Sequence, residues 1–185
     1  MNIDYTLRIA IKNDIYDIME IEKSSFNLEI CEPKSIFLER IDVFPEGFYV
    51  IESNKKVIGY ISTELWDYKE EIDTDQFTLG HSIKDLHNAE GNELYISSMG
   101  ILPIYRGIGL GKILFNDAIS KILEKSENVK SQILIVSENW GQARKIYKRN
   151  GFLEVKYIKD FLVYNNNLKE DFIVMRKLDC KNKMQ

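Results

Sequence analysis

The 185-residue sequence has few of the residues that stabilise small proteins through covalent or metal bonds. Its two cysteines, Cys31 and Cys180, have no second cysteine or histidine at metal-ligand spacing. This excludes a disulfide framework, and we expect no metal. The three prolines and ten glycines are scattered and form no linker. We therefore expect a single domain over residues 1–178 and a frayed C-terminal tail over residues 179–185.

The sequence also lacks an excess of positive charge and a long apolar run. Twenty-five basic and 29 acidic side chains give a formal net charge of −4, so the protein as a whole does not attract nucleic acid. The nearest basic cluster is typical of a solvated helix face: Arg144, Lys145, Lys148 and Arg149. No segment approaches the ~20 apolar residues that cross a bilayer, and no signal peptide is visible. We expect a soluble, cytoplasmic protein without nucleic-acid or membrane partners, and the sequence leaves a homodimer open.

The first 61 residues predict a strand, two helices and a hairpin. Residues 7–11 alternate as a strand does. A helix capped by Asn13-Asp14 follows, and its regularly spaced positions hold Ile15, Ile18, Met19 and Glu22. A second short helix from Pro33 precedes a hairpin over residues 48–61.

Residues 67–92 interrupt this regular pattern. The segment has no clear period, and a stretch of this length without periodicity is often functional or mobile. It contains both histidines, His81 and His87, which we expect at the surface. The acidic residues at 67–75 are typical of solvated charge, and the alternative is that they steer a cationic amine toward a cleft.

From residue 93 onward, strands and helices alternate clearly. We expect a strand over residues 94–101 and a glycine-rich turn over residues 106–112. The next helix has a broad apolar face made of Leu110, Ile113, Leu114, Ala118, Ile119, Ile122 and Leu123. A buried strand at 133–136, a helix that ends at Asn150-Gly151, and strands at 154–163 and 171–177 complete the pattern.

Three glycines, Gly107, Gly109 and Gly111, stand at the start of the helix that follows the turn. Unpaired backbone N–H groups and the positive end of the helix dipole meet there, and glycine lets a phosphate approach the backbone. A glycine-rich turn before a core helix is the alternative that the spacing alone leaves open. Two phosphate motifs fail: Ile113 stands where a P-loop needs Ser or Thr, and the even spacing of the glycines breaks the dinucleotide fingerprint.

Two further patterns, in order along the chain, involve this turn and a later helix. Residues 106–111 fit Arg/Gln-x-x-Gly-x-Gly/Ala, directly after Met99-Gly100-Ile101 and Pro103-Ile104-Tyr105. Residues 139–152 fit Asn…Ala-x-x-x-Tyr-x-x-x-Gly-Phe. At these residues the sequence resembles the GNAT superfamily of acetyl-CoA-dependent N-acetyltransferases. The resemblance implies a mixed α/β domain of the α+β type, with a central, mostly antiparallel sheet that is flanked by helices and splayed at the acetyl-CoA site.

The resemblance also implies which residues bind acetyl-CoA. One set of backbone groups would contact the acyl and pantetheine arm: Met99, Gly100 and Ile101. A second set would hold the pyrophosphate through backbone N–H groups: Arg106, Gly107, Ile108, Gly109, Leu110, Gly111 and Lys112. Asn139 would be a further cofactor contact. It lies four residues before Ala143, whereas the family more often has three, so Trp140 occupies the usual position.

Acetyl transfer requires proton movements at both the amine and the sulfur. A primary alkyl amine with a pKa near 10.4 is only about 1 part in 2,500 neutral at pH 7, a handicap of roughly 4.6 kcal/mol. The site must therefore deprotonate or desolvate the amine. The departing thiolate needs a proton, and the resemblance implies that Tyr147 stands near the sulfur and supplies it. Without the surrounding motif, Tyr147 would be interpreted as a helix residue packed on the core.

The motifs do not identify the base. The strand at 133–136 lacks the acid that some relatives have there, and Tyr95 and Ser97 stand where other relatives have a base. Glu93 shares a strand face with those two residues by alternation. We predict that Glu93 takes the proton, directly or through waters ordered by Ser97. The alternative is that Glu93 is a solvated residue at the start of a strand.

These patterns together predict an enzyme that transfers the acetyl group of acetyl-CoA to a primary amine. Direct attack is expected, because neither cysteine lies in a motif. The acceptor is a polyamine-like small molecule or a protein amine, and the acidic segment leans toward a small cation. The alternative is a module that binds acetyl-CoA as a sensor without turnover.

Overall fold

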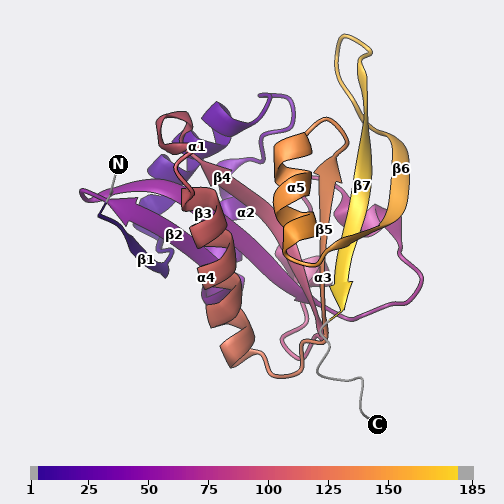
Figure 1. Cartoon of the computed structure of the whole chain (residues 1–185), viewed down its shortest axis with the longest axis horizontal. Helices are drawn as coiled ribbons and strands as arrows, with labels where there is room; N and C mark the ends of the chain where they lie inside the picture. The colour runs from indigo at the N-terminus through magenta and orange to yellow at the C-terminus, as the bar shows by residue number, and fades with distance from the viewer. Residues whose placement is uncertain (1–3, 179–185) are drawn as a thin grey trace.

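The fold is organised by a seven-stranded sheet with the order β1-β2-β3-β4-β5-β7-β6 (Figure 1). The computed structural model describes residues 4–178, so the expected tail at 179–185 lies outside the described residues. All neighbouring strands are antiparallel except β4 and β5, which are parallel. The strands are β1 (Thr6–Ile9), β2 (Phe48–Ser53), β3 (Lys56–Trp66), β4 (Glu93–Ile101), β5 (Ser131–Ser137), β6 (Leu153–Val163) and β7 (Lys169–Leu178).

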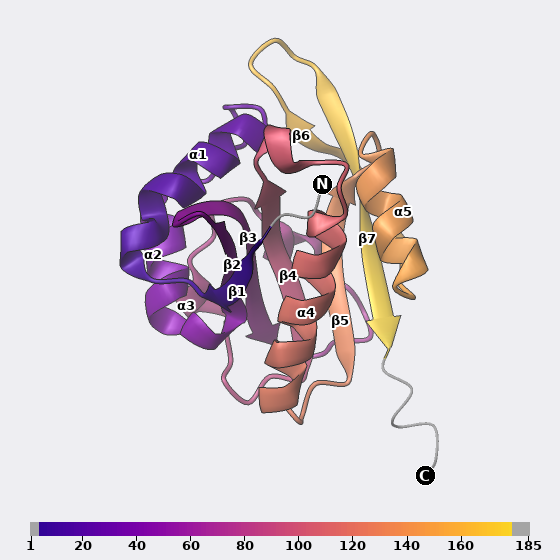
Figure 2. The ribbon, with the colours of Figure 1, turned by 60° about the vertical axis from the view of Figure 1, so that its left-hand side comes forward.

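Helices cover both faces of the sheet (Figure 2). On one face lie α1 (Ile15–Ser25), α2 (Lys34–Val43) and the short α3 (Ile83–Leu86), and on the other lie α4 (Leu110–Lys125) and α5 (Gly141–Arg149). The apolar face of α4 is buried through Leu110, Leu114, Phe115, Ala118, Ile119 and Ile122. The expected mixed α/β fold with a mostly antiparallel, helix-flanked sheet is confirmed. Within the described chain, no helix combines the length and hydrophobicity that a membrane crossing requires.

Two helix starts differ from those expected. Asp14 precedes α1, but its side chain does not cap the helix. The carboxylate instead accepts two hydrogen bonds from Arg8, at 2.7 and 2.8 Å. Pro33 precedes α2, which begins at Lys34. Asp14 and Pro33 thus directly precede their helices, but Asp14 does not cap α1 and Pro33 is not the first residue of α2.

Residues 67–92 are folded onto the sheet although they lack periodicity. A 3₁₀ turn at Thr74–Phe77 and the single turn of α3 provide the only helical structure in this part of the described chain. Phe77 and Ile83 are fully buried, and the ring of Phe77 contacts the rings of Trp66 and Tyr95. Two apolar anchors thus hold the segment.

The sheet opens where β4 and β5 stop pairing. Their parallel pairing ends at Ile96 and Leu134. Ser97, the next residue of β4, is skipped in the register with β3, which is the pattern of a β-bulge. Beyond this point the facing edges of β4 and β5 are not paired, as the expected splay requires.

Gly100 allows α1 to lie directly against β4. A Cβ atom at this position would stand 2.8 Å from Cγ2 of Ile21 on α1 and 3.1 Å from the ring of Tyr60 on β3. Because any side chain there would push the helix away, the missing Cβ sets how deeply α1 sits on the sheet. The last turn of α1 therefore reaches the splay.

Candidate active site

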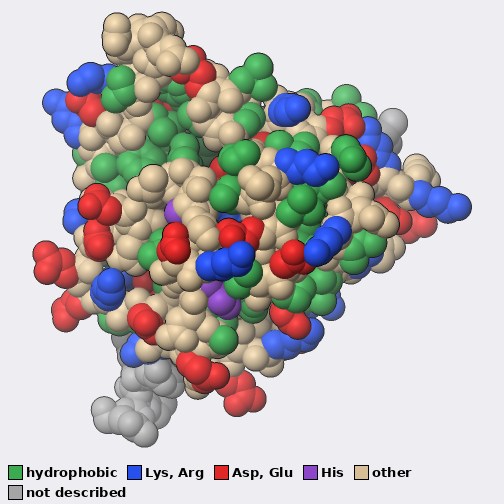
Figure 3. All heavy atoms as spheres, turned by 180° about the vertical axis from the view of Figure 1, so that it is seen from behind, with side chains coloured by type: hydrophobic (Ala, Val, Ile, Leu, Met, Phe, Trp, Pro, Cys, Tyr) green, Lys and Arg blue, Asp and Glu red, His purple; other side chains and the backbone are tan. Residues whose placement is uncertain are grey.

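A cavity opens at the splay between β4 and β5. Its polar lining consists of Glu22, Glu32, Ser97, Ser98 and Tyr147. The rest is apolar: Phe26, Ile30, Leu79, Tyr95, Ile96, Met99, Leu134, Ile135, Trp140 and Phe172. In the view from behind, hydrophobic side chains gather in a hollow beside the β6–β7 hairpin (Figure 3). The hairpin is tied to the loop after α1, because the Asn165 N–H donates to Glu29 at 2.8 Å.

Tyr147 is held by aromatic packing and lines the cavity. Its ring contacts Phe115 of α4 and Phe152 after α5, with centroids 5.5 and 6.1 Å away. The hydroxyl has no hydrogen-bond partner among residues 4–178. Burial raises the pKa of this phenol to about 12, so it is protonated at neutral pH. Tyr147 therefore brings a protonated phenol to the lining of the cavity, and its role as the proton donor stays a prediction.

Glu22, from the last turn of α1, is the polar group that the motifs did not identify. It is 2% exposed. The Tyr60 hydroxyl donates to one carboxylate oxygen, and the Glu32 backbone N–H donates to the other at 3.1 Å. Burial raises the pKa of Glu22 to about 7, against the opposing effect of the Tyr60 hydrogen bond. No ion pair to Glu22 is present in the described chain.

Glu32, the second carboxylate of the lining, is neutralised by a buried cation. Arg40 of α2, which is 1% exposed, donates to both oxygens of Glu32, one of them at 2.8 Å. Arg40 also lies 3.4 Å from Glu64 of β3. Burial alone would lower the pKa of Arg40, but the two carboxylates raise it, so the guanidinium stays charged. Of the two described carboxylates in the lining, only Glu22 lacks a cation.

Trp140, the residue after Asn139, lines the cavity at the place where Asn139 was expected to contact the cofactor. Trp140 contacts the ring of Phe26 after α1, at 5.4 Å, and the ring of Phe172 on β7, at 6.0 Å. Asn139 is exposed and does not contribute to the lining. Trp140, three residues before Ala143 where the family more often has Asn, therefore lines the cavity, and Asn139 does not.

The predicted acetyl-CoA residues lie along the opened edge of β4 and at the start of α4. Met99 lines the cavity, and Gly100 and Ile101 follow it in the buried strand. Gly107 and Gly109 have φ angles of 79° and 92°, and a Cβ at either would meet nothing within 4 Å. This turn is open, and it leads to the unpaired amides at a helix N-terminus.

The Arg106 side chain is used within the protein, which leaves only its backbone for the predicted role. Its Nε donates to the Ile101 carbonyl and its Nη2 donates to Ser25, both at 2.9 Å. Arg106 thus fastens the glycine-rich turn to the end of α1.

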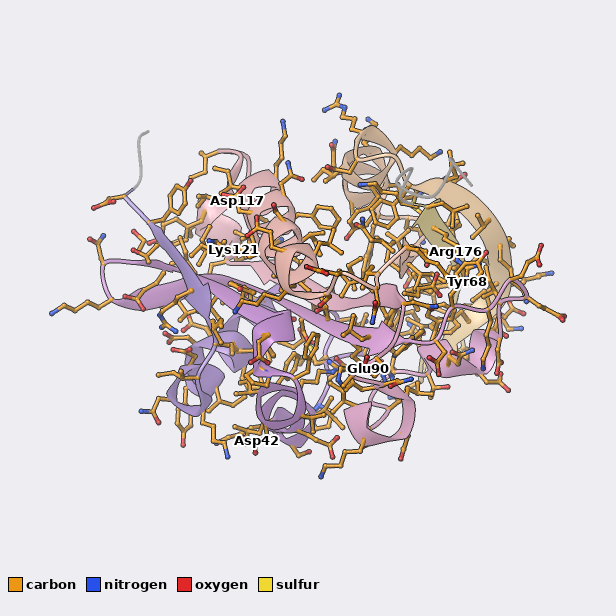
Figure 4. The ribbon with its side chains drawn as sticks, turned by 90° about the horizontal axis from the view of Figure 1, so that it is seen from below. Asp42, Tyr68, Glu90, Asp117, Lys121 and Arg176 are labelled. Atoms are coloured by element: carbon orange, nitrogen blue, oxygen red, sulfur yellow. The ribbon has the colours of Figure 1, made fainter. Side chains whose placement is uncertain are left out.

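Glu93 is not brought into the cavity. Its carboxylate pairs with Arg176 of β7 at 2.9 Å and accepts a hydrogen bond from Ser131 at 2.8 Å. Arg176 in turn stacks on the ring of Tyr68, 4.8 Å from its centroid, and the two side chains lie together in Figure 4. Glu93 lies where β4 is still paired with β5, opposite Ser131, whereas Ser97 lies beyond the end of that pairing, so the two residues are separated along the strand. The role predicted for Glu93 stays a prediction, and the residue stands in a structural contact.

The histidines are not free surface residues. His81 Nε2 lies 3.0 Å from Glu64, and its side chain is 11% exposed. Burial lowers the pKa of His81, but the hydrogen bond and charge of Glu64 outweigh this and raise it above the usual value. His87 accepts a hydrogen bond from the Leu65 N–H at 3.1 Å. The acidic residues at 67–75 contribute nothing to the cavity.

Comparison with known proteins gives a consistent picture. A family model described as "Acetyltransferase (GNAT) family" matches residues 13–152. An N-alpha-acetyltransferase of Sulfolobus acidocaldarius is 26% identical over 160 residues, 86% of each chain. The crystal structure of the loading GNATL domain of CurA from Lyngbya majuscula superposes with a TM-score of 0.78 at 15% identity, covering 95% of this chain and 98% of that one. The ribosomal-protein-S18-alanine N-acetyltransferase of Escherichia coli gives a TM-score of 0.70 at 16% identity, covering 97% and 98%.

Proposed function

This chain belongs to the acetyltransferase (GNAT) family, and from that premise we propose that it transfers the acetyl group of acetyl-CoA to the α-amine of a peptide or protein. The coarser activity, acetyl-CoA-dependent N-acetyl transfer, follows from the family and from its named relatives. The proposal for the acceptor rests on one observation. A single carboxylate without a cation, Glu22, lines an apolar cavity together with the unpartnered phenol of Tyr147.

The charge of the cavity favours one ammonium group over several. Glu22 and Glu32 are the two described acids of the lining, and Arg40 neutralises Glu32. A polyamine would place further charges among apolar residues without partners, which is unfavourable. The cavity therefore fits a single amine attached to an apolar or peptide group.

The chemistry of the amine favours the same choice. An α-amine with a pKa near 8 is neutral in roughly one molecule in ten at pH 7, whereas an alkyl amine is neutral in about one in 2,500. A site with one acid of pKa about 7 is better matched to the α-amine. The relative from Sulfolobus acidocaldarius is named as an N-alpha-acetyltransferase, which supports the assignment.

Acetyl-CoA supplies the activated acetyl group. We assign its acyl and pantetheine arm to the backbone of Met99, Gly100 and Ile101 along the opened edge of β4. We assign its pyrophosphate to the backbone N–H groups of residues 106–112, where the turn is open and α4 begins. Asn139 stays a candidate contact at the surface. Tyr147 donates the proton that the departing sulfur requires.

The test is thiol release from acetyl-CoA with a panel of peptides, polyamines and aminoglycosides. We expect turnover with peptide α-amines that exceeds turnover with polyamines. Tyr147→Phe keeps the ring and removes the donor, so it is expected to lower kcat by about 10²-fold while acetyl-CoA still binds. Tyr16→Phe, at an exposed tyrosine of α1, is the matched control.

Each other outcome has a distinct meaning. Turnover confined to polyamines would contradict the acceptor assignment and keep the family activity. Acetyl-CoA binding without turnover on any amine would favour the sensor alternative. A Tyr147→Phe variant as active as the wild type would remove Tyr147 from the chemistry.

A further inference from the structure

A buried carboxylate without a cation is costly, and Glu22 has several features that increase the cost. It occupies the apolar stripe of α1, seven residues after Ile15 and on the same side of the helix. It lies in the last turn, where the negative end of the helix dipole disfavours an anion. It is 2% exposed, and the described chain offers it no ion pair. A charge kept under these conditions calls for a functional explanation.

The surroundings of Glu22 hold its carboxylate in one orientation. Tyr60 of β3 donates its only hydroxyl proton to Glu22. Ser98 of β4 lies 2.8 Å from the Tyr60 hydroxyl and must therefore be the donor in that contact. The backbone N–H of Glu32 donates to the second oxygen. Three segments thus fix one side chain, and that side chain belongs to a residue of the cavity lining.

We propose that Glu22 accepts the proton that the acceptor amine loses during acetyl transfer, and that Tyr60 and Ser98 are positioning residues that hold its carboxylate. This inference rests on the proposed function and names the base that the motifs left unassigned. The geometry that carries it is the shared cavity, in which Glu22 from α1 and Tyr147 from α5 line the same space at the splay. Glu93 lacks this access, because Arg176 and Ser131 occupy its oxygens.

The step balances with these two side chains. The lone pair of the neutral amine forms the C–N bond to the acetyl carbon, and one N–H proton passes to the carboxylate of Glu22. The C–S bond breaks, its electron pair stays on sulfur, and the Tyr147 hydroxyl gives that sulfur a proton. Glu22 then releases its proton to water, and Tyr147 regains one from water.

The proton transfer is feasible for an α-amine. The pKa of Glu22, about 7, lies about one unit below the value near 8 of an α-ammonium, and about three units below that of an alkyl ammonium. Turnover is expected to rise with pH as the carboxylate ionises near its pKa, and to rise further as the amine loses its own proton near pH 8. The titratable or charged groups that face Glu22 or its cavity are Tyr60 of β3, Cys31 and Glu32 of the loop after α1, Arg40 of α2, Tyr95 of β4 and Tyr147 of α5.

The experiment compares three substitutions of the same kind in the full chain: Glu22→Gln, Glu93→Gln and Glu20→Gln. Glu20 is an exposed residue of the same helix that pairs with Lys56, so it is the matched control. With a turned-over peptide, Glu22→Gln is expected to lower kcat by at least about 100-fold and leave the Kd for acetyl-CoA within about twofold. The pH–rate profile of the Glu22→Gln variant should lose the rise near pH 7 that the carboxylate causes. Its remaining rise should reflect deprotonation of the amine, which has a pKa near 8.

Two measurements separate a proton acceptor from a structural residue. Glu22→Ala should regain turnover as formate is added, because a small carboxylate can fill the space, and Glu20→Ala should not respond. Tyr60→Phe keeps the carboxylate and removes the hydrogen bond that lowers its pKa. In the Tyr60→Phe variant, the rise in turnover that follows ionisation of Glu22 should therefore move to higher pH. Tyr60→Phe also tests the inference if Glu22→Gln folds poorly.

The contrary results are distinguishable. Inactivity of the wild-type chain on every amine overturns the proposed function. An active wild type whose Glu22→Gln variant keeps kcat within about threefold and retains the limb near 7 overturns the inference alone. Loss of that limb in Glu93→Gln, with Glu22→Gln unaffected, overturns the inference in favour of Glu93. An unmoved limb in Tyr60→Phe removes Tyr60 as a positioning residue.

Discussion

Two buried glutamates, Glu22 and Glu93, show how differently the same side chain can be used within one sheet. Each is 2% exposed, and burial raises the pKa of each. Glu93 stands where β4 and β5 are paired, with Arg176 at 2.9 Å. Glu22 stands over the part of β4 that β5 has left, with only hydroxyl and amide donors. Burial is common to both, so the cation and the access to the cavity make the difference.

The charge of Glu93 stabilises the fold through an ion pair, whereas the charge of Glu22 costs stability. The Glu93–Arg176 pair joins β4 to β7, and Arg176 also donates to the Lys69 carbonyl at 2.9 Å, so it anchors residues 67–92. Removing Glu93 leaves a buried cation without its carboxylate. Removing the charge of Glu22 leaves no such cation. The two residues should therefore respond in opposite directions to neutral substitution.

The largest expected effect is at the compensated pair. Arg176→Met leaves Glu93 buried without its cation and is expected to destabilise the protein by about 3–5 kcal/mol, measured by urea unfolding. The double variant Arg176→Met/Glu93→Leu should recover much of that loss, because the unpaired charge is gone. Acetyl transfer per folded molecule should persist in both. A stable single variant would show that the pair contributes little.

At Glu22 the sign of the expected effect depends on pH. Because its pKa rises from 4.5 to about 7 on folding, the wild type takes up a proton between those values and loses stability as pH increases through that window. Glu22→Gln removes this loss of stability, and the gain is reduced by the free energy of one lost hydrogen bond. It should be more stable than the wild type by about 2 kcal/mol at pH 8, and slightly less stable below pH 4.5. Urea unfolding at the two pH values checks the reversal, and equal stability at both would contradict it.

The smallest expected effect is at His81, which binds residues 67–92 to Glu64. The pKa of His81 is raised in the fold, so its stabilising contribution is complete below pH 6.5 and is lost as pH rises through the folded value. His81→Gln should therefore be less stable than the wild type by about 1.5 kcal/mol at pH 6, with a narrower gap at pH 8. Thermal unfolding at both pH values measures the gap. A constant gap would mean that the ring contributes by packing alone.

The sequence was sufficient for the elements whose pattern is local. The apolar face of α4 and the strand before the glycine turn follow from periodicity, and the positive φ of Gly107 and Gly109 explains why glycine stands there. The second motif led to Tyr147, which the structure places in the lining of the cavity. Family membership and the mixed sheet were predicted from these residues and are confirmed.

The base could not be found in the same way, because it depends on contacts between distant segments. Glu22 was visible as an acid among the apolar positions of the first helix, but its partner Tyr60 is 38 residues away. The prediction for Glu93 used alternation along β4, which gives the face of a residue but not its distance from the splay, and the pairing of β4 with β5 continues past Glu93 to Ile96. His81 was expected at the surface because Glu64, 17 residues earlier, becomes its partner only in the folded sheet.

The absence of a side chain at Gly100 sets the distance between α1 and β4. An added methyl group would lie 2.8 Å from Ile21, one residue before Glu22, so the helix would have to lift. Such a displacement changes the reach of a carboxylate whose action depends on fractions of an ångström, while most of the core stays in place. Position 100 is thus a point of low mutational tolerance that controls reaction rate through backbone spacing, without contributing an atom of side chain to the chemistry.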